Sequence, residues 1–108
     1  MGNIDGKLGP IRKGLLEFLI LKIVSADKVY AADILDRLSD TEFATQEGTL
    51  YPLLSKMRRE SLVDYHWKES EAGPPRKYYT LTPKGQSQLA ELNQYWKQIN
   101  ATINQLGS

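Results

Sequence analysis

The last part of the chain carries an apolar seam that a small domain does not need for its own core. Between residues 83 and 106, apolar side chains recur at alternating spacings of three and four residues, at Leu89, Leu92, Trp96, Ile99, Ile103 and Leu106. This repeat of roughly 3.5 residues is typical of a coiled-coil seam, along which one helix packs against another. At ~1.5 Å per residue the helix is roughly 36 Å long. Because a 108-residue chain buries a limited share of its surface, association with a second copy along this helix would add stability.

Three shorter helices are predicted before this one. Residues 11–25 are apolar nearly all round a helical wheel, which is typical of a central helix buried on several sides. Residues 30–38 carry one apolar stripe, on Ala31, Ile34, Leu35 and Leu38. The third helix is expected to have Thr45 as its N-cap and to turn an apolar side toward the core, formed by Leu50, Leu53, Leu54 and Met57.

The opposite side of the third helix is small and polar near its start and basic near its end. The residues that share this side are Gly48, Pro52, Ser55 and Arg59, with Thr49 and Lys56 flanking them. Small side chains permit close approach to the floor of a DNA major groove, and basic ones neutralise phosphates. We therefore predict that this helix contacts DNA through Thr49, Ser55, Lys56 and Arg59.

Two strands are predicted between the third helix and the last one. Residues 62–68 alternate, with Val63, Tyr65 and Trp67 on one side, and Trp67 is expected in the core of the hairpin. Residues 69–76 contain Gly73-Pro74-Pro75 and are expected to form an eight-residue loop, before a second strand over residues 77–81. Thr82 and Pro83 then provide an N-cap and a first helical residue for the long helix.

The order of these elements predicts a winged helix-turn-helix. The expected fold class is mostly α with a small β-hairpin (α+β), divided into a DNA-binding domain over residues 1–82 and a C-terminal dimerisation helix over residues 83–108. In this architecture the second helix of the pair enters the major groove and the wing follows the phosphates. Arg76 and Lys77, on the rim of the wing, are therefore predicted phosphate contacts.

The distribution of charge supports this prediction better than the net charge of +1 does. Residues 27–42 hold five acids and two bases, whereas residues 46–85 hold seven bases and five acids. The bases of the second segment form two clusters, one on the third helix and one beside the Gly-Pro turn. The distribution of charge alone is equally compatible with two basic faces that contact only solvent and not DNA.

Composition excludes several other classes of protein. The chain has no cysteine, which removes disulfides and thiol nucleophiles and fits a cytoplasmic protein. Its longest apolar stretch, residues 15–24, is broken by Glu17 and Lys22, so we expect no membrane partner. No nucleophile–base pair or phosphate loop is present, and His66 is the only histidine. We therefore expect no enzyme activity, no catalytic residue, no metal site and no cofactor.

Two separated motifs resemble those of PadR-type regulators. Residues 47–54, Glu-Gly-Thr-Leu-Tyr-Pro-Leu-Leu, are similar to the family's recognition helix, and residues 73–82 with Gly85 are similar to its wing and the start of its dimerisation helix. Residues 14–17 also match the usual opening of the first helix. The sequence departs from the pattern at Ala31-Ala32, where the family usually has Gly-Tyr, and at Ser61, where a turn glycine is usual. We expect Ser61 or a neighbour to adopt a strained turn.

The resemblance implies a homodimeric repressor of the small subfamily, which has a single C-terminal helix and recognises a pseudo-palindromic operator. Dimerisation would use Leu89, Leu92, Trp96, Ile99 and Ile103. Some small members hold planar aromatic or phenolic compounds beside a tryptophan of this helix, so Trp96 either packs the dimer or stacks on an effector. Tyr51 either contacts DNA or packs on the wing. A winged helix that serves as a protein–protein adaptor is the alternative function.

Overall fold

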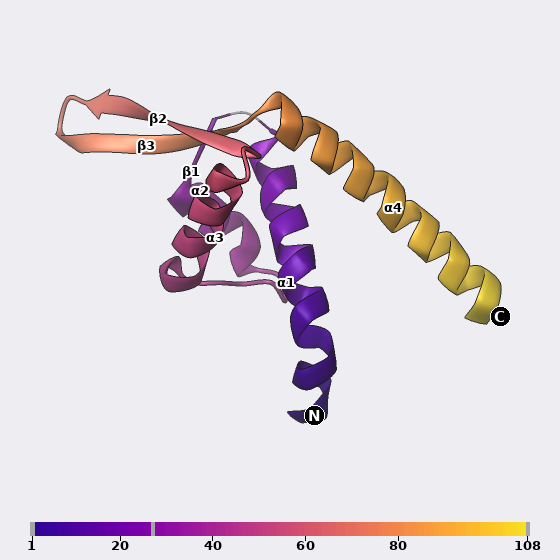
Figure 1. The fold of residues 1–108 in the computed structure, drawn as a ribbon. Coiled ribbons are helices and arrows are strands. Elements are labelled where there is room, and N and C mark those ends of the chain that lie inside the picture. Colours follow the sequence, from indigo (N-terminus) through magenta and orange to yellow (C-terminus); the bar gives the residue numbers. More distant parts are fainter. Residues whose placement is uncertain (1, 27, 108) are drawn as a thin grey trace.

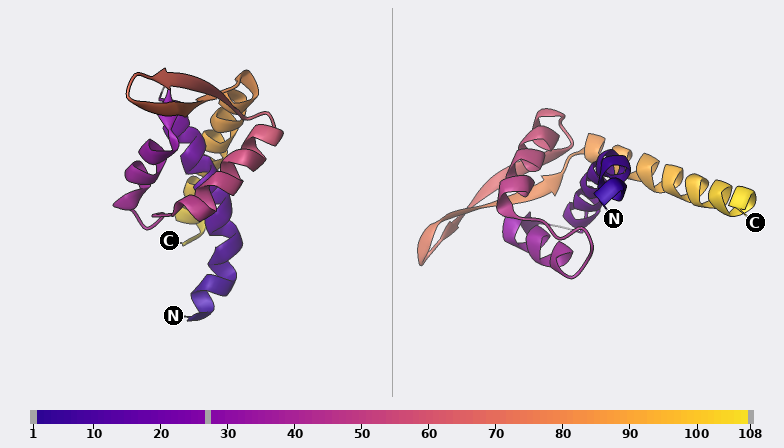
Figure 2. Two further views of the ribbon diagram at one scale, coloured as in Figure 1. Left: turned by 90° about the vertical axis from the view of Figure 1, so that its left-hand side faces the viewer. Right: turned by 90° about the horizontal axis from the view of Figure 1, so that it is seen from below.

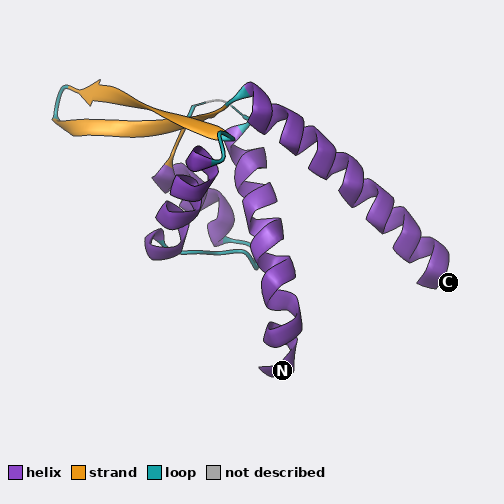
Figure 3. Ribbon diagram, in the orientation of Figure 1, coloured by secondary structure: helices purple, strands orange, loops and turns teal. Residues whose placement is uncertain are grey.

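The structure, a computed structural model, describes residues 2–26 and 28–107. Residue 27 of the acidic segment and residues 1 and 108, the ends of the two expected domains, lie outside the described residues. The elements follow the order α1 (Gly2–Val24), β1 (Val29–Tyr30), α2 (Ala31–Ser39), α3 (Glu47–Arg59), β2 (Val63–Ser70), β3 (Gly73–Leu81) and α4 (Pro83–Gly107). A body formed by α1, α2, α3 and the base of the sheet carries two projections, the β2–β3 hairpin and α4 (Figures 1 and 3). The predicted α+β winged-helix fold is confirmed.

The core of the body lies where α1, α2 and α3 meet beneath the sheet, which crosses the upper ends of the helices (Figure 2). Apolar side chains fill it, and the most deeply buried large ones are Ile20, Leu21, Val24, Ile34, Leu50, Leu54, Met57 and Val63. The four core positions predicted on α3 are all buried. Since Ile20, Leu21, Ile23 and Val24 are all buried, the prediction of a central first helix is correct in its second half.

The helix α1 begins nine residues earlier than the predicted Ile11, at Gly2, and contains Pro10. The prediction rested on the apolar residues of positions 11–25, and the residues before them lack such a pattern. The start of α1 extends beyond the body (Figure 1), and both Leu8 and Ile11 are exposed. One turn with a missing hydrogen bond is compatible with a helix whose surroundings are solvent.

The helix pair begins at different residues from those predicted. Tyr30 precedes α2, and its backbone N–H donates to the Asp33 carboxylate at 2.9 Å. The N-cap of α3 is Gln46 rather than Thr45, because the backbone carbonyl of Gln46 accepts the N–H groups of Thr49 and Leu50 at 3.0 and 2.9 Å. The side chain of Gln46 makes no capping hydrogen bond, so this helix start gives no local sequence signal.

The sheet has three antiparallel strands in the order β1–β3–β2, and not the two that were predicted. The unpredicted strand β1 pairs Val29 with Tyr79 and Tyr30 with Tyr78. It is two residues long, and its pairing with residues far along the chain leaves no periodic pattern. The sequence prediction had placed Tyr30 in the following helix instead.

The wing is a longer hairpin with a shorter turn than predicted. Strand β3 begins at Gly73 and includes Pro74 and Pro75, so the predicted eight-residue loop over residues 69–76 is wrong. Lys68 pairs with Arg76 and Ser70 pairs with Gly73, with an irregularity between them. This bulge sets two prolines opposite one residue, Glu69, and a proline without an N–H needs no ladder partner. The wing hairpin, β2 and β3 together, therefore projects as a regular arm.

A tight joint connects the end of α3 to the start of α4. Ser61 has a φ of 63°, which confirms the strained turn expected at this position. The Thr82 hydroxyl accepts the Gly85 N–H at 2.9 Å, as a predicted N-cap should, and donates to the Ser61 carbonyl at 2.5 Å. A Cβ on Gly85 would lie 2.0 Å from the Leu62 carbonyl oxygen. We call Ser61, Leu62, Thr82 and Gly85 the α3–α4 joint.

Candidate nucleic-acid interface

The polar side of α3 is exposed along its whole length. Thr49, Tyr51, Ser55 and Arg59 are exposed, and Lys56 is half-buried. The buried apolar side fixes this orientation, because Leu50 and Met57 lock the helix against the core. The second helix of the pair thus presents small and basic groups outward, as the sequence predicted.

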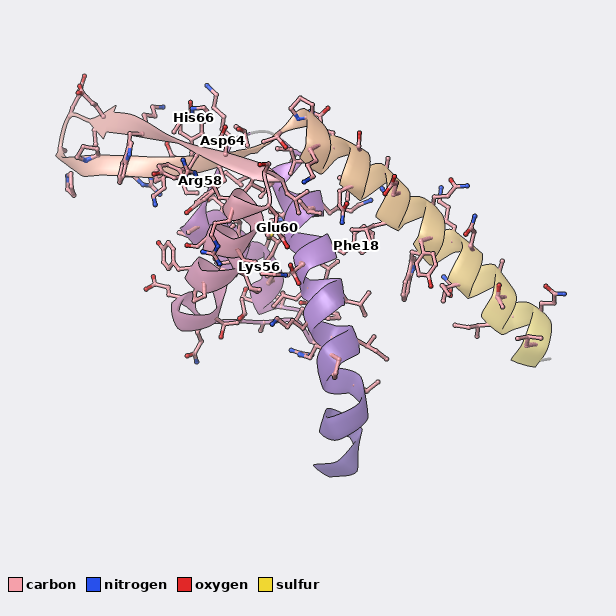
Figure 4. All side chains as sticks on the ribbon, viewed as in Figure 1. Phe18, Lys56, Arg58, Glu60, Asp64 and His66 are labelled. Atoms are coloured by element: carbon pink, nitrogen blue, oxygen red, sulfur yellow. The ribbon has the colours of Figure 1, made fainter. Side chains whose placement is uncertain are left out.

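Lys56 differs from the other predicted contacts because its ammonium already has partners. Its Nζ lies 2.8 Å from Oε1 of Glu17 on α1 and 3.9 Å from Oε2 of Glu60. The hydrogen bond that Lys56 donates to Glu17 and the charge of that carboxylate raise the pKa of Lys56 above its ordinary value. In Figure 4 Lys56 and Glu60 lie in the space between α3 and α1. By contrast, Arg59 forms no ion pair with any residue that the structure describes.

The two cations of the wing rim are held over aromatic rings. The guanidinium of Arg76 lies 3.9 Å from the ring centroid of Tyr30, and the Nζ of Lys77 lies 4.3 Å from that of Tyr65. Adjacent residues of a strand point to opposite faces, so these two cations serve both faces of the wing hairpin. Stacking on a ring leaves the guanidinium edge free to donate to a phosphate. Tyr30 is thus a site residue that the sequence prediction missed, because β1 was missed.

Tyr51 lies on the side of α3 that faces the wing. A hollow of about 320 Å³ separates the two elements, and Tyr51, Trp67, Arg76 and Lys77 are among the residues that line it. Burial raises the pKa of Tyr79 at its base, and the neighbouring Tyr51 and Tyr65 raise it further. Tyr51 nevertheless keeps 44% of its surface exposed, so a wing neighbour and an outside ligand can both contact it.

Trp67 is not a core residue of the hairpin, contrary to the prediction. It is 62% exposed, although it lies on the same face as the buried Val63 and Tyr79. The alternation of the strand was read correctly, but the wing hairpin extends past the body (Figure 1), so no helix of the described chain covers its outer part. Trp67 instead contacts Tyr65 edge to face, with 6.2 Å between the ring centroids.

The predicted seam on α4 divides into three parts. Leu89 and Leu92 pack half-buried against the body. Leu92, Trp96 and Ile99 line a groove of about 470 Å³ between α1 and α4, together with Pro10, Ile11, Gly14, Leu15, Phe18 and Tyr95. Figure 4 shows Phe18 between these two helices. Ile103 lies beyond this α1–α4 groove and is exposed.

The described residues offer little to other kinds of site. Residues 2–26 and 28–107 contain no cluster of three histidine, cysteine or acidic side chains that could hold a metal ion. Within the same ranges, no helix combines the length and hydropathy needed to cross a membrane. The helix pair, the exposed second helix and the cation-bearing hairpin together define a winged helix-turn-helix protein of the DNA-binding class.

Comparison with known proteins identifies the family. The model of the PadR-like transcriptional regulator family matches residues 20–91, which run from α1 through the wing into α4. This is more than half of the chain, so the chain belongs to the PadR-like family of transcriptional regulators. It is accordingly a DNA-binding regulator of transcription and not an enzyme.

Solved structures agree with this assignment, and one curated sequence is similar over most of its length. A PadR-like transcription factor from Bacteroides fragilis is 44% identical, with a TM-score of 0.83 over 94% of this chain and 99% of that chain. A PadR-like transcriptional regulator from Bacillus cereus is 42% identical, with a TM-score of 0.78 over 87% of this chain and 92% of that one. An uncharacterized protein of Lysinibacillus sphaericus is 26% identical over 97 residues, which cover 87% of this chain and 89% of that protein.

Proposed function

We propose that this regulator is a homodimeric repressor, with a DNA-binding domain over residues 1–82 and a dimerisation helix over residues 83–108. The observation that carries the proposal is the α1–α4 groove, an apolar surface that the chain's own core leaves open. Trp96 on its wall is 44% exposed, and Leu106 further along α4 is 78% exposed. Apolar side chains repeated along one helix favour burial against a second copy of the same helix.

A two-fold dimer presents two copies of α3 to the duplex. Two-fold symmetry in the protein requires two-fold symmetry in the operator, with half-sites about one helical turn apart. The proposed contacts are Thr49, Tyr51, Ser55, Lys56 and Arg59 on α3, and Arg76 and Lys77 on the wing. Thr49 and Ser55 are small enough to approach base edges, whereas the cations meet phosphates. Lys56 reaches a phosphate only in competition with Glu17.

Release of the operator by a planar aromatic or phenolic effector is the second part of the proposal. Trp96 and Tyr95 contribute two ring faces to the α1–α4 groove, whose volume of about 470 Å³ fits a small aromatic molecule. An effector there would contact both the dimerisation helix and α1. A coupling of about 1–3 kcal/mol between this site and DNA would suffice for regulation.

Titration of duplex binding against salt tests the core of the proposal. A protein that contacts phosphates loses affinity at about 0.9 log unit per contact per decade of salt. Footprinting of a duplex selected from a random pool should then give two related half-sites. A single asymmetric half-site would argue against the dimeric operator, and the absence of duplex binding at every salt concentration would favour the adaptor function instead.

Tryptophan fluorescence tests the effector separately. Since Trp67 on the wing also emits, the measurement uses a Trp67→Phe background, in which Trp96 is the remaining tryptophan. We expect planar aromatics to quench this emission and to weaken operator binding over the same concentration range. Quenching without a change in DNA affinity would leave a binding site but no sensor.

A further inference from the structure

A second hollow lies on the side of α3 that faces away from the wing. It has a volume of about 510 Å³ and separates the first half of α1 from the recognition helix. The residues that line this α1–α3 groove include four cations, Arg12, Lys13, Lys56 and Arg59. Thr49 and Pro52 of α3 form its opposite wall. Neither Arg12 nor Lys13 belongs to the DNA contacts proposed above.

The charges in the α1–α3 groove are not balanced by acids. Glu17 pairs with Lys56, which removes one of the four cations. Lys13 and Arg59 are both exposed, and neither forms an ion pair within residues 2–26 and 28–107. Two unneutralised cations beside a helix that faces DNA are suited to a single anionic group between them.

Arg12 holds this part of α1 in place beside the helix-turn-helix. Its Nη2 donates to the backbone carbonyl of Glu42, and its guanidinium lies 5.0 Å from the ring centroid of Phe43. Both partners belong to the segment between α2 and α3. The position of Lys13, one residue further along α1, is therefore fixed relative to α3 even though the start of α1 extends beyond the body.

We propose that the α1–α3 groove seats a backbone phosphate of duplex DNA, held by Lys13 and Arg59. A helix in the major groove, about 12 Å wide, has one phosphate backbone on each side. Tyr51 faces the wing and Thr49 faces α1, so the wing cations and the α1 cations lie on opposite sides of α3. Arg76 and Lys77 meet one backbone, and Lys13 with Arg59 meets the other. This inference rests on the proposed operator binding and adds a contact from α1 to it.

Single substitutions on α1 test the assignment. Lys13→Ala is compared with Lys22→Ala, which removes an equally exposed lysine from the other end of the same helix. Loss of one phosphate contact per subunit should flatten the salt slope of the dimer by about 1.8 and weaken binding about 30-fold near 0.15 M salt. Lys13→Arg should restore most of the affinity, and sequence preference should stay unchanged.

Neutral methylphosphonate groups at single backbone positions locate the contact. Wild-type protein should lose affinity at phosphates on both edges of the major groove. Lys13→Ala should become less sensitive than wild-type protein at one edge only, and Arg76→Ala at the other. If Lys13→Ala behaves like Lys22→Ala while Arg76→Ala still weakens binding, the α1 contact is refuted and the proposed function stands. If wild-type protein binds no duplex, the proposed function itself fails. Sedimentation of Lys13→Ala must show the wild-type oligomeric state, because a loss of dimer would contradict a pure phosphate contact.

Discussion

The body and α4 differ in how far their apolar side chains are buried. In the body, apolar residues of α1, α2, α3 and the sheet cover one another, and 16 of them form a continuous buried core. In α4, which has 25 residues, the only buried position is Gly85 at the first turn. Trp96 and Leu106 remain exposed although they follow the same seam as the half-buried Leu92.

This difference in burial indicates that the body and α4 have different roles. The body is complete in one chain, so its exposed side chains are free to meet DNA. The seam of α4 stays largely uncovered in one chain, and under the proposed function a second copy of the chain buries it. The α3–α4 joint lies between the two regions, so the angle of α4 would set the distance between the two recognition helices of the proposed dimer.

The largest effect is expected when apolar side chains of the α4 seam are truncated. Trp96→Ala combined with Ile99→Ala should give monomers with an intact body. Loss of the second half-site removes the effective concentration that linkage provides, so operator affinity should fall about 10²–10⁴-fold. Sedimentation and operator titration measure the two effects. Gln98→Ala, on the outward side of α4, is the control and should remain dimeric. Intact dimers of the double variant would refute the assignment of the seam.

A smaller effect is expected from a substitution that strains the α3–α4 joint, which connects the body to α4. In Gly85→Ala the new Cβ would meet the Leu62 carbonyl oxygen at 2.0 Å, so either the strand end or α4 must shift. Such overpacking costs typically about 1–3 kcal/mol, which a thermal unfolding curve resolves.

The control for the joint is another glycine in a helix. Gly6→Ala adds a Cβ with no atom within 4 Å and should stabilise α1 slightly, since alanine favours helix. Equal melting temperatures for the two variants would show that the close contact at Gly85 does not affect the stability of the fold. A Gly85→Ala protein that keeps its stability but loses operator affinity would indicate that the joint sets the spacing of the half-sites.

Local patterns predicted the buried sides of α2 and α3 and the start of α4, but not the starts of α1 and α3. The stripe of α2, the buried side of α3 and the Thr82 cap all depend on residues within a few positions of one another. The strand β1 was missed because Val29 and Tyr30 are held by residues about 50 positions further along the chain. The bulge at Pro74 and Pro75 depends on the partner strand in the same way.

The residues of the candidate site were also predictable where they depend on neighbouring positions, and not where they depend on distant segments. The outward side of α3 could be read from a helical wheel, and each of its predicted residues is accessible at least in part. The pairing of Lys56 with Glu17, 39 positions away, could not be read in this way. Nor could the stacking of Arg76 on Tyr30, which needs β1 beside β3. Contacts between distant segments therefore decide which of the predicted cations are free.

The next prediction concerns the wing and leaves the α4 seam untouched. Arg76→Ala removes a phosphate contact and should weaken binding about fivefold per site near 0.15 M salt, for every sequence alike. The salt slope should flatten in parallel, as measured by fluorescence anisotropy. Arg37→Ala, which removes an exposed arginine from α2, is the matched control. A change in sequence preference with an unchanged slope would place Arg76 at a base edge and not at a phosphate.

The smallest expected effect concerns Lys56, whose ammonium is paired with Glu17 inside the body. Glu17→Gln removes the carboxylate 2.8 Å from the Lys56 ammonium and leaves an isosteric amide in its place. Lys56 then keeps only the longer contact with Glu60 and approaches a phosphate more readily, so duplex binding should tighten a few-fold at low salt and the gain should vanish at high salt. Glu91→Gln on α4 makes the same change in net charge far from α3, and only a local effect of Glu17 can separate the two variants. Equal affinities would mean that Lys56 stays beside α1 even without Glu17 and adds no phosphate contact to those of the other predicted cations.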